Sequence, residues 1–161
     1  MKSWLFVAVI AVLGACGASS AEVKAAQTAQ YRAPRETLFK IALQTAGQDY
    51  KIEAQDIERA ILFTEGQWYN PEGGRESVGA GDRAQVVDHS VMLMMVVEVM
   101  GMEGGDLYVQ VTPKVFQYLE GSPKPRELKP DDPNIPGWVQ GRVETLQLAI
   151  YKNAKQYEVQ R

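Results

Sequence analysis

The chain has 161 residues, of which 45% are hydrophobic, and this is enough for one domain with a sizeable core. Its 17 basic and 20 acidic side chains give a formal net charge of −3, which becomes −4 if Lys2 is removed with an N-terminal signal, and this mild acidity argues against a nucleic-acid or anionic-lipid binder. One histidine and one cysteine are too few ligands for a zinc site.

The N-terminus has the layout of a secretory signal peptide. Lys2 supplies a positive charge, residues 5–13 form an apolar run, and small residues follow. The run is shorter than the roughly 20 residues that a membrane-spanning helix needs. We expect residues 1–15 to be a signal peptide. The alternative is a buried N-terminal helix, but the polar sequence that follows does not continue it with an amphipathic pattern, so we favour the signal peptide.

The end of this segment carries the sole cysteine. Leu13, Gly14, Ala15 and Cys16 stand in the order of a lipobox, and the N-terminus therefore resembles the signal of bacterial lipoproteins. That resemblance implies cleavage before Cys16, acylation of its sulfur and its new amino group, and a lipid-anchored protein of the cell envelope. Gly17 follows where aspartate would favour the inner membrane, so the resemblance implies the periplasmic face of the outer membrane.

Acyl chains on Cys16 would provide a lasting anchor. Each buried CH₂ contributes about 0.8 kcal/mol to membrane binding. One acyl chain binds the membrane only marginally, whereas two or three chains hold the protein there. Because acylation consumes the thiol, the mature chain would have no disulfide and would depend on its core for stability.

Residues 17–33 are small and polar, and they predict a flexible tether. Such a tether has an end-to-end distance of roughly 20–25 Å. The alternative is a short helix through the alanine-rich part of the segment.

The remainder, residues 34–161, predicts a single domain that begins and ends with a helix. Residues 34–46 have an apolar stripe at helical spacing, with Pro34 in the first turn and Gly47 as the expected stop. Residues 137–157 carry a second stripe. Five prolines exclude a helix or central strand from residues 120–138. Strands are expected over residues 50–54, 59–69, 86–100 and 107–119.

This order predicts an α+β fold, an antiparallel sheet of three or four strands with the N-terminal and C-terminal helices packed on one face. The element order, with Tyr50, Asp56, residues 60–62, Thr64 and Trp68, resembles the domains of the lipoprotein C subunit of the outer-membrane β-barrel assembly machinery. Those domains wrap a sheet around a helix. The chain departs from them at Ala60, where a glycine would suit the pattern better.

The strand over residues 86–100 is apolar on both faces. Met92, Met94 and Val96 share one face, and the intervening residues share the other, so the strand is expected to be central. Three interpretations of the methionines stay open. They fill the core, they form an adaptable surface for a partner protein or lipid, or Met92 and Met94 bind Cu(I) through their thioethers.

Two other groups of residues resemble a catalytic triad and a calcium loop, but neither fits the pattern. Asp88, His89 and Ser90 are neighbours, but neighbours in a strand point to opposite faces and cannot form a catalytic triad. Asp131, Asp132 and Asn134 lack the glycine and glutamate of a calcium loop and predict a solvated turn. With no paired carboxylates evident, we expect no enzymatic activity and no cofactor.

The sequence thus predicts a non-enzymatic lipoprotein that acts as a binding or scaffolding component of an outer-membrane complex. Its partner contacts would be Met92, Met94 and Val96 together with the 120–138 segment. One alternative is a carrier that holds an apolar molecule between sheet and helices, in a pocket lined by Phe39, Leu43, Leu93 and Leu146. The other is a Cu(I)-handling protein that uses Met92 and Met94.

Overall fold

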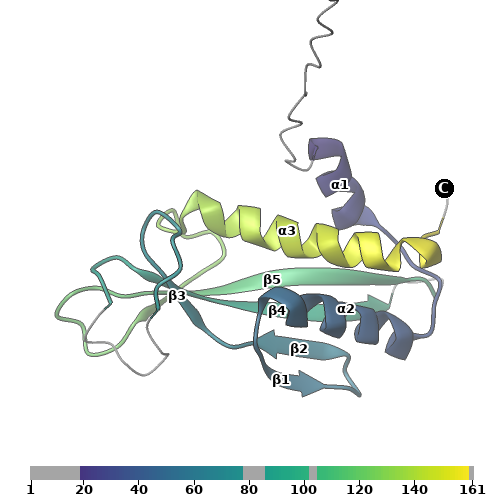
Figure 1. The fold of residues 1–161 in the computed structure, drawn as a ribbon, viewed down its shortest axis with the longest axis horizontal. Coiled ribbons are helices and arrows are strands. Elements are labelled where there is room, and N and C mark those ends of the chain that lie inside the picture. The colour runs from purple at the N-terminus through teal and green to yellow at the C-terminus, as the bar shows by residue number, and fades with distance from the viewer. Residues whose placement is uncertain (1–18, 78–85, 102–104, 160–161) are drawn as a thin grey trace, which may run out of the picture.

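The computed structural model describes residues 19–77, 86–101 and 105–159. Three α-helices and six strands account for most of these residues (Figure 1). The helices are α1 (Ser20–Thr28), α2 (Arg35–Asp49) and α3 (Gly137–Ala154), and a 3-10 turn, Lys155–Tyr157, continues α3. The strands are β1 (Ile52–Asp56), β2 (Ile61–Thr64), β3 (Gln67–Tyr69), β4 (Val91–Gly101), β5 (Leu107–Gln117) and β6 (Arg126–Leu128).

All six strands belong to one antiparallel sheet. Its order is β1-β2-β4-β5-β6, and β3 pairs with β4 next to the end of β2. Helices α2 and α3 pack against each other and lie on one face of this sheet, α2 against β4 and β2 and α3 against β5 (Figure 1). The predicted α+β fold is confirmed, but the sheet has six strands rather than three or four.

Two features of the structure account for the two additional strands. The single strand expected over residues 59–69 is divided into β2 and β3 at Glu65 and Gly66, and a Cβ on Gly66 would lie 2.9 Å from the Met92 sulfur. Glycine allows this close approach, whereas a residue with a Cβ would require the Met92 side chain to shift. The proline segment contains β6, which lies at the sheet edge where proline-rich sequence is tolerated.

Strand β4 is central, as its two apolar faces predicted. One face packs against the helices through five side chains that are each no more than 2% exposed, and these are Val91, Leu93, Met95, Val97 and Val99. The predicted start of this strand at residue 86 was wrong, because residues 88 and 89 form a turn and β4 begins at Val91.

Helix α2 runs past its predicted end. Gly47 was expected to stop it, yet the helix continues to Asp49, and the amide of Tyr50 still donates to the Ala46 carbonyl. Gly47 is exposed and adopts helical geometry, so it costs about 1 kcal/mol relative to alanine without ending the helix.

The expected tether over residues 17–33 was wrong for the described part of that segment, since it contains α1. Ser19 and Glu22 form a reciprocal capping box that starts the helix. Its far end leads into the core, where Ala26, Ala29 and Tyr31 are 2%, 7% and 0% exposed. The alternative interpretation, a short helix, is the one that the structure supports.

Ala60 occupies a position that favours glycine. Its φ is +55°, in the left-handed region that residues with a Cβ rarely adopt. The methyl group is nevertheless buried in the core, and the Ala60 carbonyl accepts a hydrogen bond from the Val99 amide. The turn between β1 and β2 is therefore strained at Ala60.

None of the helices in the described ranges combines the length and the apolar character needed to cross a bilayer.

The two faces of β4 should respond differently to truncation. Met95→Ala removes a fully buried side chain and should lower the free energy of unfolding by about 2–5 kcal/mol. Met94→Ala, on the half-buried opposite face, should cost about 1 kcal/mol. Urea denaturation measures both, and equal losses would contradict the assignment of the core to the helix side.

Candidate binding site at the β5 edge

The predicted site residues fall in two places. Cys16 lies outside the described residues. Met92, Met94 and Val96 share the face of β4 away from the helices, as their spacing indicated. Val96 is only 8% exposed and both methionines are half-buried, so this face does not present the three side chains as an open apolar surface.

Neighbouring side chains on the same face account for part of this burial. Trp68 on β3 and Phe116 on β5 lie directly opposite Met92, one on each side, and Trp68 is 2% exposed. Farther along, the Lys114 ammonium stands 5.8 Å from the centre of the Phe63 ring. Whether this face contacts a partner or Cu(I) stays a prediction.

The four side chains that were expected to line a carrier pocket lie in the hydrophobic core or against it. Phe39, Leu93 and Leu146 are 2–3% exposed and belong to the hydrophobic core, and Leu43 packs against that core. These side chains therefore belong to the region where α2 and α3 pack onto the sheet. Whether they surround an apolar ligand stays a prediction.

A pocket of about 370 Å³ lies beside the outer edge of β5, between α1 and α3. Its lining combines polar and apolar side chains, and one residue, Glu144, is charged. The lining consists of Gln27, Tyr108, Val109, Gln110, Val111, Thr112, Pro113, Gln140, Val143, Glu144 and Gln147.

The pocket coincides with a gap in the row of strands next to β5. At one end of the gap Tyr31 bridges to Leu107, and at the other end β6 pairs with residues 115–117. Between them, residues 108–114 have a strand partner only on the β4 side within the described parts of the chain. An uncovered edge presents backbone groups that need other hydrogen-bond partners.

Gln147 of α3 satisfies part of this edge. Its amide nitrogen donates to the Val109 carbonyl (2.9 Å), and its amide oxygen accepts from the Val111 amide (3.0 Å). The same nitrogen also donates to the Ala26 carbonyl of α1 at 3.1 Å. Gln147 is 5% exposed, so one buried carboxamide joins α1, α3 and β5 where a neighbouring strand would otherwise lie.

Sequence reasoning missed Gln147, although a signal was present. Val143, Gln147 and Ile150 fall on the same stripe of the closing helix, and a glutamine on an apolar stripe needs hydrogen-bond partners when buried. The pattern marks the residue as unusual. Its partners lie 36 to 121 residues away, and only the packing of the helices identifies them.

Tyr31 closes the gap at its other end. Its amide donates to the Leu107 carbonyl (2.7 Å), and its carbonyl accepts from the Leu107 amide (2.9 Å). On its other side the segment pairs with the C-terminal residues, since Tyr31 bridges to Glu158 and the Val159 amide donates to the Gln30 carbonyl. The segment after α1 therefore lies between β5 and the end of the chain.

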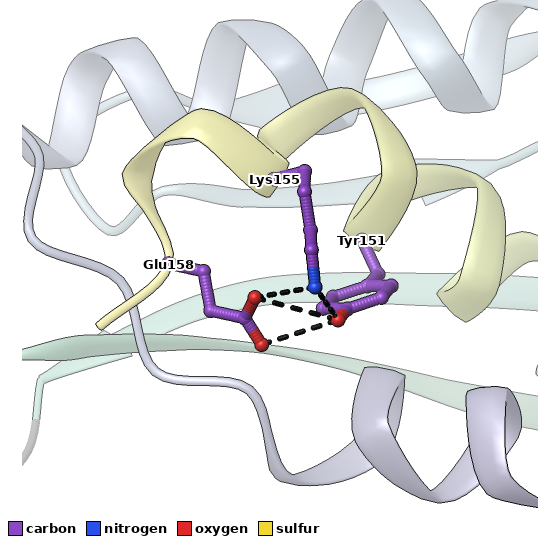
Figure 2. Close-up of polar contacts among 3 residues, drawn as sticks. All are labelled: Tyr151, Lys155 and Glu158. Carbon is purple, nitrogen blue, oxygen red and sulfur yellow. Dashed lines mark hydrogen bonds and ion pairs between the residues drawn. The ribbon is translucent and has the colours of Figure 1, made fainter. Parts of the chain in front are cut away.

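A polar cluster holds the end of α3 beside this segment. Figure 2 shows the Lys155 ammonium between the Tyr151 hydroxyl and the Glu158 carboxylate, and it donates to that hydroxyl. The Tyr151 hydroxyl in turn donates to Glu158 at 3.2 Å. The hydrogen bonds to Glu158 and Tyr151 raise the pKa of Lys155. The arrangement secures the last turn of the helix.

The hydroxyl of Tyr31, unlike the backbone groups of the same residue, is unpaired within the described residues. It is buried and has no hydrogen-bond partner among them. Burial raises the pKa of this hydroxyl, and the nearby Glu158 and Tyr151 raise it further. A buried hydroxyl without a partner costs about 1–3 kcal/mol, so the position tolerates tyrosine at some expense in stability.

Asp88, His89 and Ser90 do not form a triad, although the geometric reason given for this was wrong. His89 is not in a strand but in a turn with φ +64°, and its ring nitrogen lies 3.5 Å from Asp88. Ser90 is fully buried and donates to Glu76 at 3.0 Å. The serine hydroxyl is therefore committed to a structural hydrogen bond.

The segment around Asp132 is a turn, as predicted. The backbone and side-chain amides of Asn134 donate to the Asp132 carboxylate at 2.9 and 2.8 Å. These bonds lower the pKa of Asp132. Over the parts of the chain that the structure covers, no group of three or more histidine, cysteine or acidic side chains is placed to hold a metal ion.

Comparison with known proteins places the chain in no family. No protein-family model matches it, and no curated protein matches it either.

Removing the Gln147 carboxamide should destabilise the β5 edge. Gln147→Ala leaves the Val109 carbonyl and the Val111 amide without partners and should lower the free energy of unfolding by about 2–4 kcal/mol. Hydrogen exchange at Val111 should accelerate. Gln140→Ala, an exposed control in the same helix, should change stability by less than about 0.5 kcal/mol. Equal effects would show that the edge does not depend on Gln147.

Tyr31 should make stability sensitive to alkaline pH. The pKa of Tyr31 is higher in the folded chain than in the unfolded chain, where it lies near 10. The protonated hydroxyl therefore adds nothing pH-dependent below about pH 10, and above it the free energy of unfolding falls by up to about 1.4 kcal/mol per pH unit. Burial also raises the pKa of Tyr50. Tyr31→Phe should therefore make the alkaline loss shallower and raise stability at pH 7 by up to about 1 kcal/mol. Denaturation at pH 7 and pH 11 tests this, and an unchanged slope would contradict it.

Proposed function

We propose that this chain is a lipid-anchored envelope protein, held at the periplasmic face of the outer membrane by acyl chains on Cys16. Its folded part binds or supports a protein partner in an outer-membrane complex, without enzymatic activity. The observation that carries the proposal is the order Leu13-Gly14-Ala15-Cys16 at the end of a short apolar run.

The position of α1 supports a domain that lies close to its anchor. The capping box begins at Ser19, three residues after Cys16, and three residues of chain span at most about 11 Å. The expected tether of 20–25 Å is therefore replaced by a short link and a helix. This arrangement suits a protein that acts at the membrane surface better than one that reaches far into the periplasm.

With acyl chains on Cys16, the same geometry would bring the β5 edge near the membrane. Helix α1 has nine residues and is about 14 Å long, and Gln27 near its end lines the pocket. The pocket thus lies within about 25 Å of Cys16 along the chain. A partner that engaged this edge would be held beside the bilayer, which favours a scaffolding role.

Acylation is the step on which the proposed function depends. Metabolic labelling with a palmitate analogue should label the native chain, and Cys16→Ser should abolish the label and release the protein from the membrane fraction. Ser19→Ala, which removes a cap outside the lipobox, serves as the control and should leave labelling unchanged. Identical labelling of the native and Cys16→Ser chains would overturn the anchor.

A further inference from the structure

The gap beside β5 has the dimensions of a missing strand. It spans the seven residues 108–114, which corresponds to about 23 Å at 3.3 Å per residue. The elements at both of its ends, Tyr31 and β6, lie antiparallel to β5. A short segment in the same direction would make the row continuous.

The backbone groups of β5 in this gap point outward. Val109 and Val111 reach Gln147 with a carbonyl and an amide, and in an antiparallel sheet alternate residues direct both of their backbone groups to the same side. Pro113 has the same parity and offers a carbonyl but no amide. The edge can therefore form both kinds of strand hydrogen bond at Val109 and Val111, but it lacks the donor at Pro113.

The Gln147 carboxamide has the chemistry of one peptide unit. It supplies one N–H donor and one C=O acceptor to the two groups that a neighbouring strand would use. A strand that entered the gap would replace these two hydrogen bonds with two of the same kind, so the exchange leaves no backbone group of β5 unpaired.

We propose that this edge binds an extended peptide segment of a partner protein, which adds to the sheet as an antiparallel strand between Tyr31 and β6 and displaces the Gln147 carboxamide. This inference rests on the partner-binding part of the proposed function and specifies the chemistry of the partner. Affinity comes from main-chain hydrogen bonds, and specificity comes from the pocket beside the edge.

The pocket selects for a basic side chain in that segment. In an added strand alternate residues point to the helix side, where the pocket is lined by Gln27, Gln140 and Glu144. Glu144 is the one charged lining residue, and it accepts a hydrogen bond from Gln140 at 2.9 Å. A lysine or arginine that faces Glu144 has a partner there, whereas an acidic residue meets like charge.

The test uses the full chain in detergent and a displayed library of random linear octapeptides. Selected peptides should be enriched in lysine or arginine and should slow hydrogen exchange at Val109 and Val111, whose backbone groups face the gap. N-methylation of alternate peptide nitrogens, which removes donors and keeps the side chains, should weaken binding at least about tenfold. No selected peptide, protection elsewhere, or no effect of N-methylation overturns the proposal.

Three variants sharpen the result. Glu144→Gln should weaken basic peptides about threefold or more, whereas Glu127→Gln, on the exposed surface of β6, should leave affinity unchanged. Gln147→Ala should strengthen binding, because the competing carboxamide is gone; weakened binding by a folded Gln147→Ala chain counts against displacement. If that variant does not fold, the N-methylated peptides still decide the question with the native chain.

The two proposals fail separately. A chain that binds these peptides but takes up no palmitate label overturns the anchor and keeps the β5 site. A chain that takes up the palmitate label but binds no peptide keeps the anchor and overturns the β5 site.

Discussion

The structure depends on how the outer edge of β5 finds its hydrogen bonds. An edge strand leaves backbone groups that must be paired when they are buried. Here three unrelated elements supply the partners: the backbone of Tyr31, the side chain of Gln147 and the three residues of β6. Each comes from a different part of the chain, so the edge joins the N-terminal helix, the closing helix and the proline segment into one domain.

This constraint explains why α1 belongs to the folded domain. Its composition is that of a linker, and only Ala26 within the helix is buried. What holds it is the Gln147 bond to the Ala26 carbonyl, together with the burial of Ala29 and Tyr31 immediately after it. The proposed lipidation site, Cys16, and the first residue of the capping box are separated by two residues in the sequence, so the proposed membrane attachment would also fix the position of the β5 edge.

The sheet supports this arrangement through β4. Its helix-facing side chains form the centre of the core and give α2 and α3 a continuous apolar surface to pack on. The pocket lies at the margin of the sheet, beside the place where Gln147 joins α1, α3 and β5. The candidate site therefore borders the core through Val109, Val111 and Val143.

The sequence by itself determined the two long helices and the central position of β4, because each follows from local periodicity over ten or more residues. The α+β class, with both helices on one face, followed from the order of the elements. The break between β2 and β3, the left-handed Ala60 and the order in α1 were decided by contacts with distant residues. Gln147 illustrates the boundary: its place on an apolar stripe is visible in the sequence, but its hydrogen bonds to residues 26, 109 and 111 exist only once the helices and the sheet have packed. Long-range hydrogen bonds leave no periodic signal, and for that reason tertiary structure alone revealed the β5 edge.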